Sequence, residues 1–154
     1  MGRTKEEIKA GAKVFGQAAH TLGVIGQAAL KADEFTGKQM IAQNIIPSIV
    51  LKAFSCELFF KSLIVAQQDD IKNIHKLDQL FAHINDTDKS TIKSLVISQL
   101  SITNQHYNEI NFDTDLGKAA NAFVDWRYFY EEPRSINIEF LDVLFDVLWK
   151  YRQD

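Results

Sequence analysis

Two residues of opposite charge interrupt apolar helical stripes, and a carboxylate and a guanidinium suit each other as a buried ion pair. Glu57 lies in SCELFFKSLIVAQ, and Arg127 lies among the aromatic residues of AFVDWRYFYEE, residues 122–132. A charge that is buried without a partner costs several kcal/mol of stability. Because a guanidinium can donate two parallel hydrogen bonds to one carboxylate, the sequence predicts that Glu57 and Arg127 face each other in the interior.

Sequence alone leaves the role of this pair open. It can be a structural ion pair that fixes how two helices register, or it can belong to a binding or catalytic site. Alternatively, Arg127 lies at the edge of its stripe and extends its guanidinium to water. If Arg127 is held inside, neighbouring rings can stack on the guanidinium plane; these rings are Trp126, Tyr128 and Tyr130.

The apolar spacing around both charges predicts the helices that carry them. A helix over residues 39–67 is either bent at Pro47 or begins near Ile45. Its apolar residues recur in alternating steps of four and three: Ile46, Val50, Ala53, Phe60 and Ile64. A helix over residues 114–131, which Pro133 ends, has the same rhythm in Leu116, Ala120, Phe123 and Tyr130. Each series lacks one apolar residue at the expected spacing. Glu57 occupies that position in the first helix, and Arg127 occupies it in the second.

The remaining segments are also helical in pattern. Helices are predicted over residues 4–32, 75–84 and 89–104, and from Asn137 to the C-terminus. The first is rich in small residues, which indicates close helix–helix approach; they are Ala12, Gly16, Ala19, Gly23 and Gly26. No segment alternates strictly between apolar and polar residues. The sequence therefore predicts an all-α, single-domain bundle of five to six helices over residues 1–154.

Polar residues before two of these helices are candidate N-caps. Asp86 or Asp88 is expected to cap the helix over residues 89–104. The segment HYNEINFDTD reads as a loop, after which Asp113 or Thr114 is expected to cap the helix that carries Arg127.

The amino-acid composition bears on the class of protein, its partners and its compartment. The chain has 154 residues, of which 46% are hydrophobic and 24% charged, as in an ordinary globular protein. Its net charge of −3 gives no general attraction to nucleic acid or anionic membrane, and DNA is not expected as a partner. A single cysteine, no apparent signal peptide and no unbroken apolar span favour a cytoplasmic protein that does not enter membranes.

Other candidate chemistry is weaker. No His or Cys spacing fits a metal site, and no cofactor is expected. His75 reads as a cap or loop contact that orients its short helix, and Cys56 as a buried thiol. Six lysines could converge as a basic patch for RNA or simply be solvated; these are Lys52, Lys61, Lys72, Lys76, Lys89 and Lys93.

Three of these segments, in this order, resemble the HEPN superfamily of small helical bundles. Its members often carry a Glu-x-x-x-Lys helix, a His-x-Leu-x-x-Leu helix and a later arginine helix. Here these are Glu57 to Lys61, HKLDQL from His75 to Leu80, and Arg127 in WRY. The resemblance covers residues 45–150 and implies a HEPN-like fold that forms a homodimer, in a bacterial-type stress or defence setting.

The resemblance also implies a test for activity, because many HEPN proteins are metal-independent ribonucleases. Their signature is an arginine, a polar residue directly after it, and a histidine four to six residues further on. Tyr128 follows Arg127, and the histidine positions hold Glu132, Pro133 and Arg134. Histidine suits proton transfer near neutral pH, so its absence argues against that ribonuclease activity.

We therefore expect a non-catalytic HEPN-like binding or scaffold module, with RNA or a nucleotide as the expected ligand. The binding residues would be Arg127, Glu57, Trp126, Lys61 and His75. One alternative is a divergent metal-independent endoribonuclease with Arg127 at its centre. Its other catalytic candidates are Glu131, Tyr128 and Tyr130. A second alternative is a purely structural protein–protein interaction module.

Overall fold

Helices make up the whole regular structure of the described chain. The computed structural model describes residues 4–29, 41–64, 73–120 and 137–151, and within these ranges it contains no strand. The elements are α1 (Lys5–Ala29), η1 (Ile41–Ile45), α3 (Ile46–Ile64), α4 (Leu77–His83), α5 (Asp86–Leu100), α6 (Glu109–Ala119) and α8 (Ile138–Lys150). The predicted all-α bundle is confirmed.

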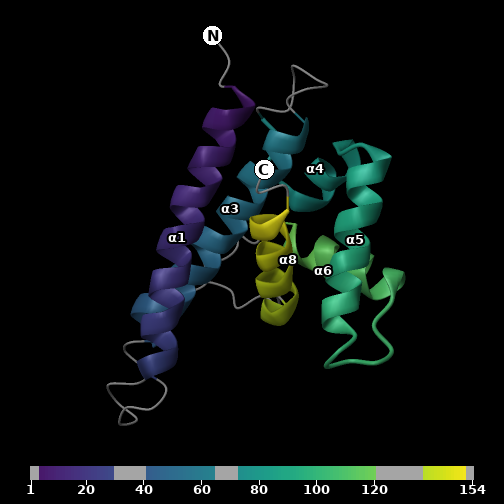
Figure 1. Cartoon of the computed structure of the whole chain (residues 1–154). Helices are drawn as coiled ribbons and strands as arrows, with labels where there is room; N and C mark the ends of the chain where they lie inside the picture. The colour runs from purple at the N-terminus through teal and green to yellow at the C-terminus, as the bar shows by residue number, and fades with distance from the viewer. Residues whose placement is uncertain (1–3, 30–40, 65–72, 121–136, 152–154) are drawn as a thin grey trace.

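The first two long helices, α1 and α3, lie side by side and run antiparallel (Figure 1). Two buried hydroxyl groups on α3 bond to the backbone of α1. Ser48 Oγ donates to the Ala19 carbonyl and Ser55 Oγ to the Ala12 carbonyl, each at 2.7 Å. Ala12 and Ala19 are fully buried. The small residues of α1 therefore do allow close helix–helix approach, as the sequence indicated.

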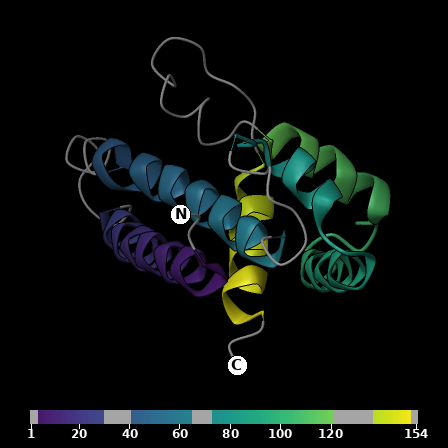
Figure 2. The ribbon, with the colours of Figure 1, turned by 90° about the horizontal axis from the view of Figure 1, so that it is seen from above.

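Helix α8 lies between the α1–α3 pair and the group formed by α4, α5 and α6, as the view from above shows (Figure 2). A chain of ring contacts joins α3, α4, α6 and α8 through Phe60, Phe81, Phe112 and Phe140. Successive ring centroids are 5.6, 5.4 and 5.5 Å apart. The four rings are at most 8% exposed, so this chain is the centre of the core.

Pro47 is the second residue of α3, which settles how the long second helix begins. A π-helical turn over Ile41–Ile45 precedes α3, which starts at Ile46. Proline is tolerated in the first turn, where its missing N–H has no intrahelical acceptor. The α-helix itself begins at Ile46, but η1 continues the helical path before it without a break, with Pro47 next to the change from π-helix to α-helix.

The predicted N-caps of two helices are wrong. Asn85, and not Asp86 or Asp88, caps α5, because its side chain accepts a hydrogen bond from the backbone N–H of Asp88. Asp88 is instead buried at 1% exposure, with its carboxylate bonded to Asn85 and to the Tyr151 hydroxyl. An asparagine at this position satisfies the free N–H groups as well as an aspartate does.

Helix α6 begins earlier than its sequence pattern suggested. Asn108 is its N-cap and forms a reciprocal capping box with Asn111, whereas Asp113 and Thr114 lie inside the helix. Seven of the ten residues of the expected loop, from Glu109 onward, are therefore helical, and they include Phe112, which is buried one turn before Leu116. The remainder of the predicted helix over residues 114–131 lies outside the described residues.

The last helix follows its prediction, since Asn137 caps α8 through a bond from the Phe140 N–H. Among the described helices, none is both long enough and apolar enough to cross a lipid bilayer.

Candidate functional site

Glu57 and Lys61 form a buried ion pair on one face of α3. Their spacing of four residues places them one turn apart, with the acid on the N-terminal side, the favourable order for such a pair. Lys61 Nζ lies 2.9 Å from Glu57 Oε1. Glu57 is 1% exposed and Lys61 is 9% exposed. The predicted burial of Glu57 is therefore observed, and one partner comes from its own helix.

His75 joins this pair from the extended stretch that precedes α4. Its Nδ1 lies 2.9 Å from Glu57 Oε1, the oxygen that also accepts from Lys61. The N-cap of α4 is Lys76, so His75 is a loop residue. Its side chain is 59% exposed, whereas that of Glu57 is 2% exposed. The three residues link the middle of α3 to the start of α4 and reach the surface through the imidazole.

The contact with Glu57 fixes the tautomer of His75. An ionised carboxylate oxygen can only accept hydrogen bonds, so Nδ1 must carry the proton that it donates to Oε1. In the neutral ring, Nε2 then carries the lone pair. The buried acid thus orients an imidazole that is accessible to solvent.

The second oxygen of Glu57 has no hydrogen-bond partner among the described residues. Oε2 is buried, and it is the one buried side-chain nitrogen or oxygen atom in those ranges without a partner. A buried acceptor left without a donor is costly. Glu57 Oε2 can therefore accept a hydrogen bond from one more donor.

Ala120, the last described residue before residue 121, contacts the first residue of α4. The backbone N–H of Leu77 donates to the carbonyl of Ala120 at 3.2 Å, and Leu77 is two residues from His75. Arg127, Trp126, Tyr128, Tyr130 and Glu131 lie outside the described residues, and so does the predicted contact between Arg127 and Glu57.

Most of the lysines considered for a basic patch are paired with acids at separate places. Lys52 bonds Asp142 at 2.7 Å, and Lys93 bonds Asp113 at 2.9 Å. Lys89 lies 3.2 Å from Asp86. Lys72 is outside the described residues. These contacts place Lys52, Lys89 and Lys93 in separate ion pairs and not in a common patch.

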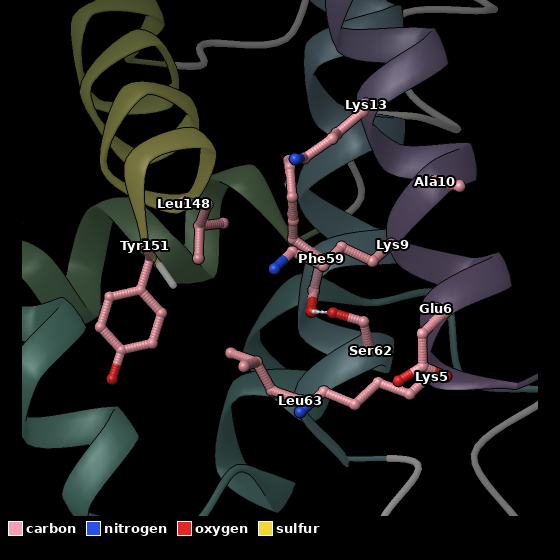
Figure 3. A pocket seen from close by; sticks show the side chains of 10 residues that line it. All are labelled: Lys5, Glu6, Lys9, Ala10, Lys13, Phe59, Ser62, Leu63, Leu148 and Tyr151. Carbon is pink, nitrogen blue, oxygen red and sulfur yellow. Dashed lines mark hydrogen bonds between the residues drawn. The ribbon is translucent and has the colours of Figure 1, made fainter. Parts of the chain in front are cut away.

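Sequence reasoning missed a second cationic feature, a cleft beside the N-terminal half of α1 (Figure 3). Lys5, Lys9 and Lys13 line it from one face of that helix. The signal was present as lysines repeated every four residues, which places them on one helical face.

Cys56 is fully buried, and burial raises the pKa of its thiol far above the usual value. The thiolate that reactive cysteines need is therefore suppressed. The described residues contain no group of three or more His, Cys, Asp or Glu side chains placed to hold a metal ion.

Comparison of the chain with family models, with curated proteins and with solved structures gave no match. The case for a function therefore depends on the chemistry of the Glu57–Lys61–His75 cluster and on the resemblance in sequence.

Proposed function

We propose that this protein is a HEPN-like helical module that binds RNA without cleaving it, through a site built on Glu57. The observation that carries the proposal is the meeting of Lys61 and His75 on one buried carboxylate oxygen. These are the three residues through which α3 and α4 resemble the HEPN pattern, and they are 18 residues apart at their extremes in sequence.

Arg127 is the donor that we assign to the free oxygen of Glu57. A guanidinium offers several N–H groups and can bind a carboxylate while it still faces a phosphate. The entry of the chain to residues 121–136 beside Leu77 supports this assignment. With Lys61, His75 and Arg127 around a single acid, the cluster is cationic overall and attracts phosphate, with Trp126 available to stack on a base.

The absence of a histidine after Arg127 is the reason for proposing binding without cleavage. A specific observation nevertheless favours divergent ribonuclease activity as the second candidate. His75 Nε2, oriented through Glu57, could accept the proton of a ribose 2′-hydroxyl. Tyr128, Tyr130 or Glu131 would then have to protonate the leaving oxygen.

Fluorescence anisotropy with a labelled single-stranded RNA tests binding through this cluster. Titrations at several salt concentrations should show affinity that falls as salt rises, because phosphate contacts release counterions. His75→Ala should weaken binding roughly tenfold, since a charge-assisted hydrogen bond contributes about 1.5–3 kcal/mol. His83→Ala is the matched control, because His83 is also exposed and lies at the far end of α4. Equal affinities for the two variants would contradict the proposed site.

The same RNA, incubated with protein and EDTA and run on a denaturing gel, separates the two candidates. Intact RNA is the expected result. Cleavage that disappears in His75→Ala would instead establish the ribonuclease. If RNA does not bind even at low salt, the remaining candidate function is protein–protein interaction.

We also infer that the protein is a homodimer. The part of α1 from Val14 to Ala29 contains no Asp, Glu, Lys or Arg, although its outer face carries the exposed residues Val14, Val24 and Ile25. An exposed apolar helix face without charges suits a second copy of the same helix.

A further inference from the structure

We infer that the cleft between α1, α3 and α8 binds a small phosphorylated molecule with an aromatic body, the chemistry of a nucleotide. This inference does not depend on RNA binding at Glu57. The cleft has a volume of about 510 Å³, which lies within the usual range of 300–1,000 Å³ for ligand pockets.

One wall of the cleft is a row of lysines on α1. Lys5, Lys9 and Lys13 extend from this helix across the cleft towards α3 (Figure 3). Lys5 and Lys13 form no ion pair within the described part of the chain. Glu6 is the one acid among the lining residues. The wall is therefore positive, although the whole protein has a net charge of −3.

The opposite walls are apolar and aromatic. Phe59 and Leu63 of α3 and Leu148 of α8 line the cleft, together with Tyr151 just after α8. Phe59 and Leu148 are buried, whereas Leu63 and Tyr151 are partly exposed and present surface to a ligand. Ser62 cannot add a free donor, because its hydroxyl donates to the Phe59 carbonyl at 2.7 Å.

These two walls together define the ligand class. Ammonium groups bind phosphate oxygens as point charges, and an apolar wall with a tyrosine ring takes a flat or aromatic body. A purely apolar ligand would leave the lysines unused, and an inorganic anion would leave the apolar wall exposed. A nucleotide uses both walls.

The cleft and the Glu57 cluster lie on opposite faces of α3. Successive residues of a helix turn by about 100°, so Phe59, Ser62 and Leu63 point away from the face that carries Glu57 and Lys61. A ligand in the cleft therefore does not touch His75. Variants at one site can be used as controls for the other.

Isothermal titration calorimetry with adenosine and uridine diphosphates tests the inference, with pyrophosphate and adenosine as partial ligands. Both nucleotides should bind, and each partial ligand should bind more weakly. The double variant Lys5→Gln/Lys13→Gln should weaken nucleotide binding at least about tenfold, since each lost contact to phosphate removes a charge-assisted bond. Ala10→Trp, which enlarges an exposed lining residue at the rim of the cleft and keeps every charge, should also weaken binding.

The matched control is Lys89→Gln/Lys118→Gln, which removes the same charge from α5 and α6 and should leave nucleotide affinity unchanged. Both cleft variants should retain RNA binding, and His75→Ala should retain nucleotide binding. The inference is overturned if no nucleotide binds at low salt. It is also overturned if pyrophosphate binds as tightly as nucleotides, or if the control weakens binding equally. A lower melting temperature of the lysine variant without any nucleotide binding would show that these lysines contribute to the stability of the fold instead.

Discussion

At the scale of residues, three acids are buried in the part of the chain that the structure describes, and they are of two kinds. Asp88 and Asp115 each accept hydrogen bonds from a tyrosine hydroxyl and an asparagine amide, Asp88 on both oxygens and Asp115 on Oδ2. Glu57 differs because its second oxygen, Oε2, is itself buried and has no hydrogen-bond partner in the described chain. A buried group whose bonding is incomplete is a better candidate for a binding site than one that is complete.

Tyr107 provides a pH-dependent prediction for one of the structural acids. Its hydroxyl donates to Asp115 Oδ2 at 2.9 Å, and burial, followed by this bond, raises the pKa of Tyr107 above its usual value of 10.0. The folded state then holds the proton at a pH where the unfolded chain releases it. The stabilisation is fully present below pH 10 and is lost as the pH rises further.

Urea unfolding of wild type and Tyr107→Phe at pH 8 and above pH 10 measures this effect. At pH 8 the variant should be about 1–2 kcal/mol less stable, since it lacks the hydrogen bond to Asp115. The difference should shrink above pH 10, because only the wild type loses the tyrosine contribution. A constant difference between the two proteins at both pH values would contradict the assignment.

At the scale of elements, Gly16 sets how closely α1 approaches α8. A Cβ on Gly16 would lie 2.7 Å from Trp149 Cζ3 and 2.8 Å from Phe145 Cε2, so these rings would have to move. Gly16→Ala should cost about 1–3 kcal/mol of stability as overpacking. Gly117→Ala in α6 is the control: nothing lies within 4 Å of its Cβ, and alanine should stabilise the helix by up to about 1 kcal/mol. Denaturant melts of both variants should shift in opposite directions.

The helices show which elements could be predicted from the sequence and which could not. Apolar periodicity located α1, α3 and α8 because each buries a continuous stripe. It missed the start of α6, because Asn108 and Asn111 cap each other among polar residues that resemble a loop. Glu57 was found as a charge in an apolar stripe. Its bond to His75 joins α3 to the stretch before α4, and it could not be predicted because it depends on how these segments pack in three dimensions. The cleft beside α1 depends on tertiary packing in the same way.

At the scale of the whole molecule, the exposed face of α1 makes the dimer testable. Val14 is 67% exposed and Ile25 is 39% exposed, and their separation of eleven residues places them on the same helical face. Between them, Ala18 and Thr21 keep the face small and uncharged, so that two copies of α1 could approach closely. If the homodimer forms here, Val14→Glu/Ile25→Glu should convert it to a monomer in light scattering, because the introduced charges would be buried together. Ile102→Glu/Ile110→Glu is the matched control, since Ile102 and Ile110 are 82% and 76% exposed but lie near the start of α6. A dimer that survives the α1 changes and dissociates with the control changes would move the interface to the α5–α6 side.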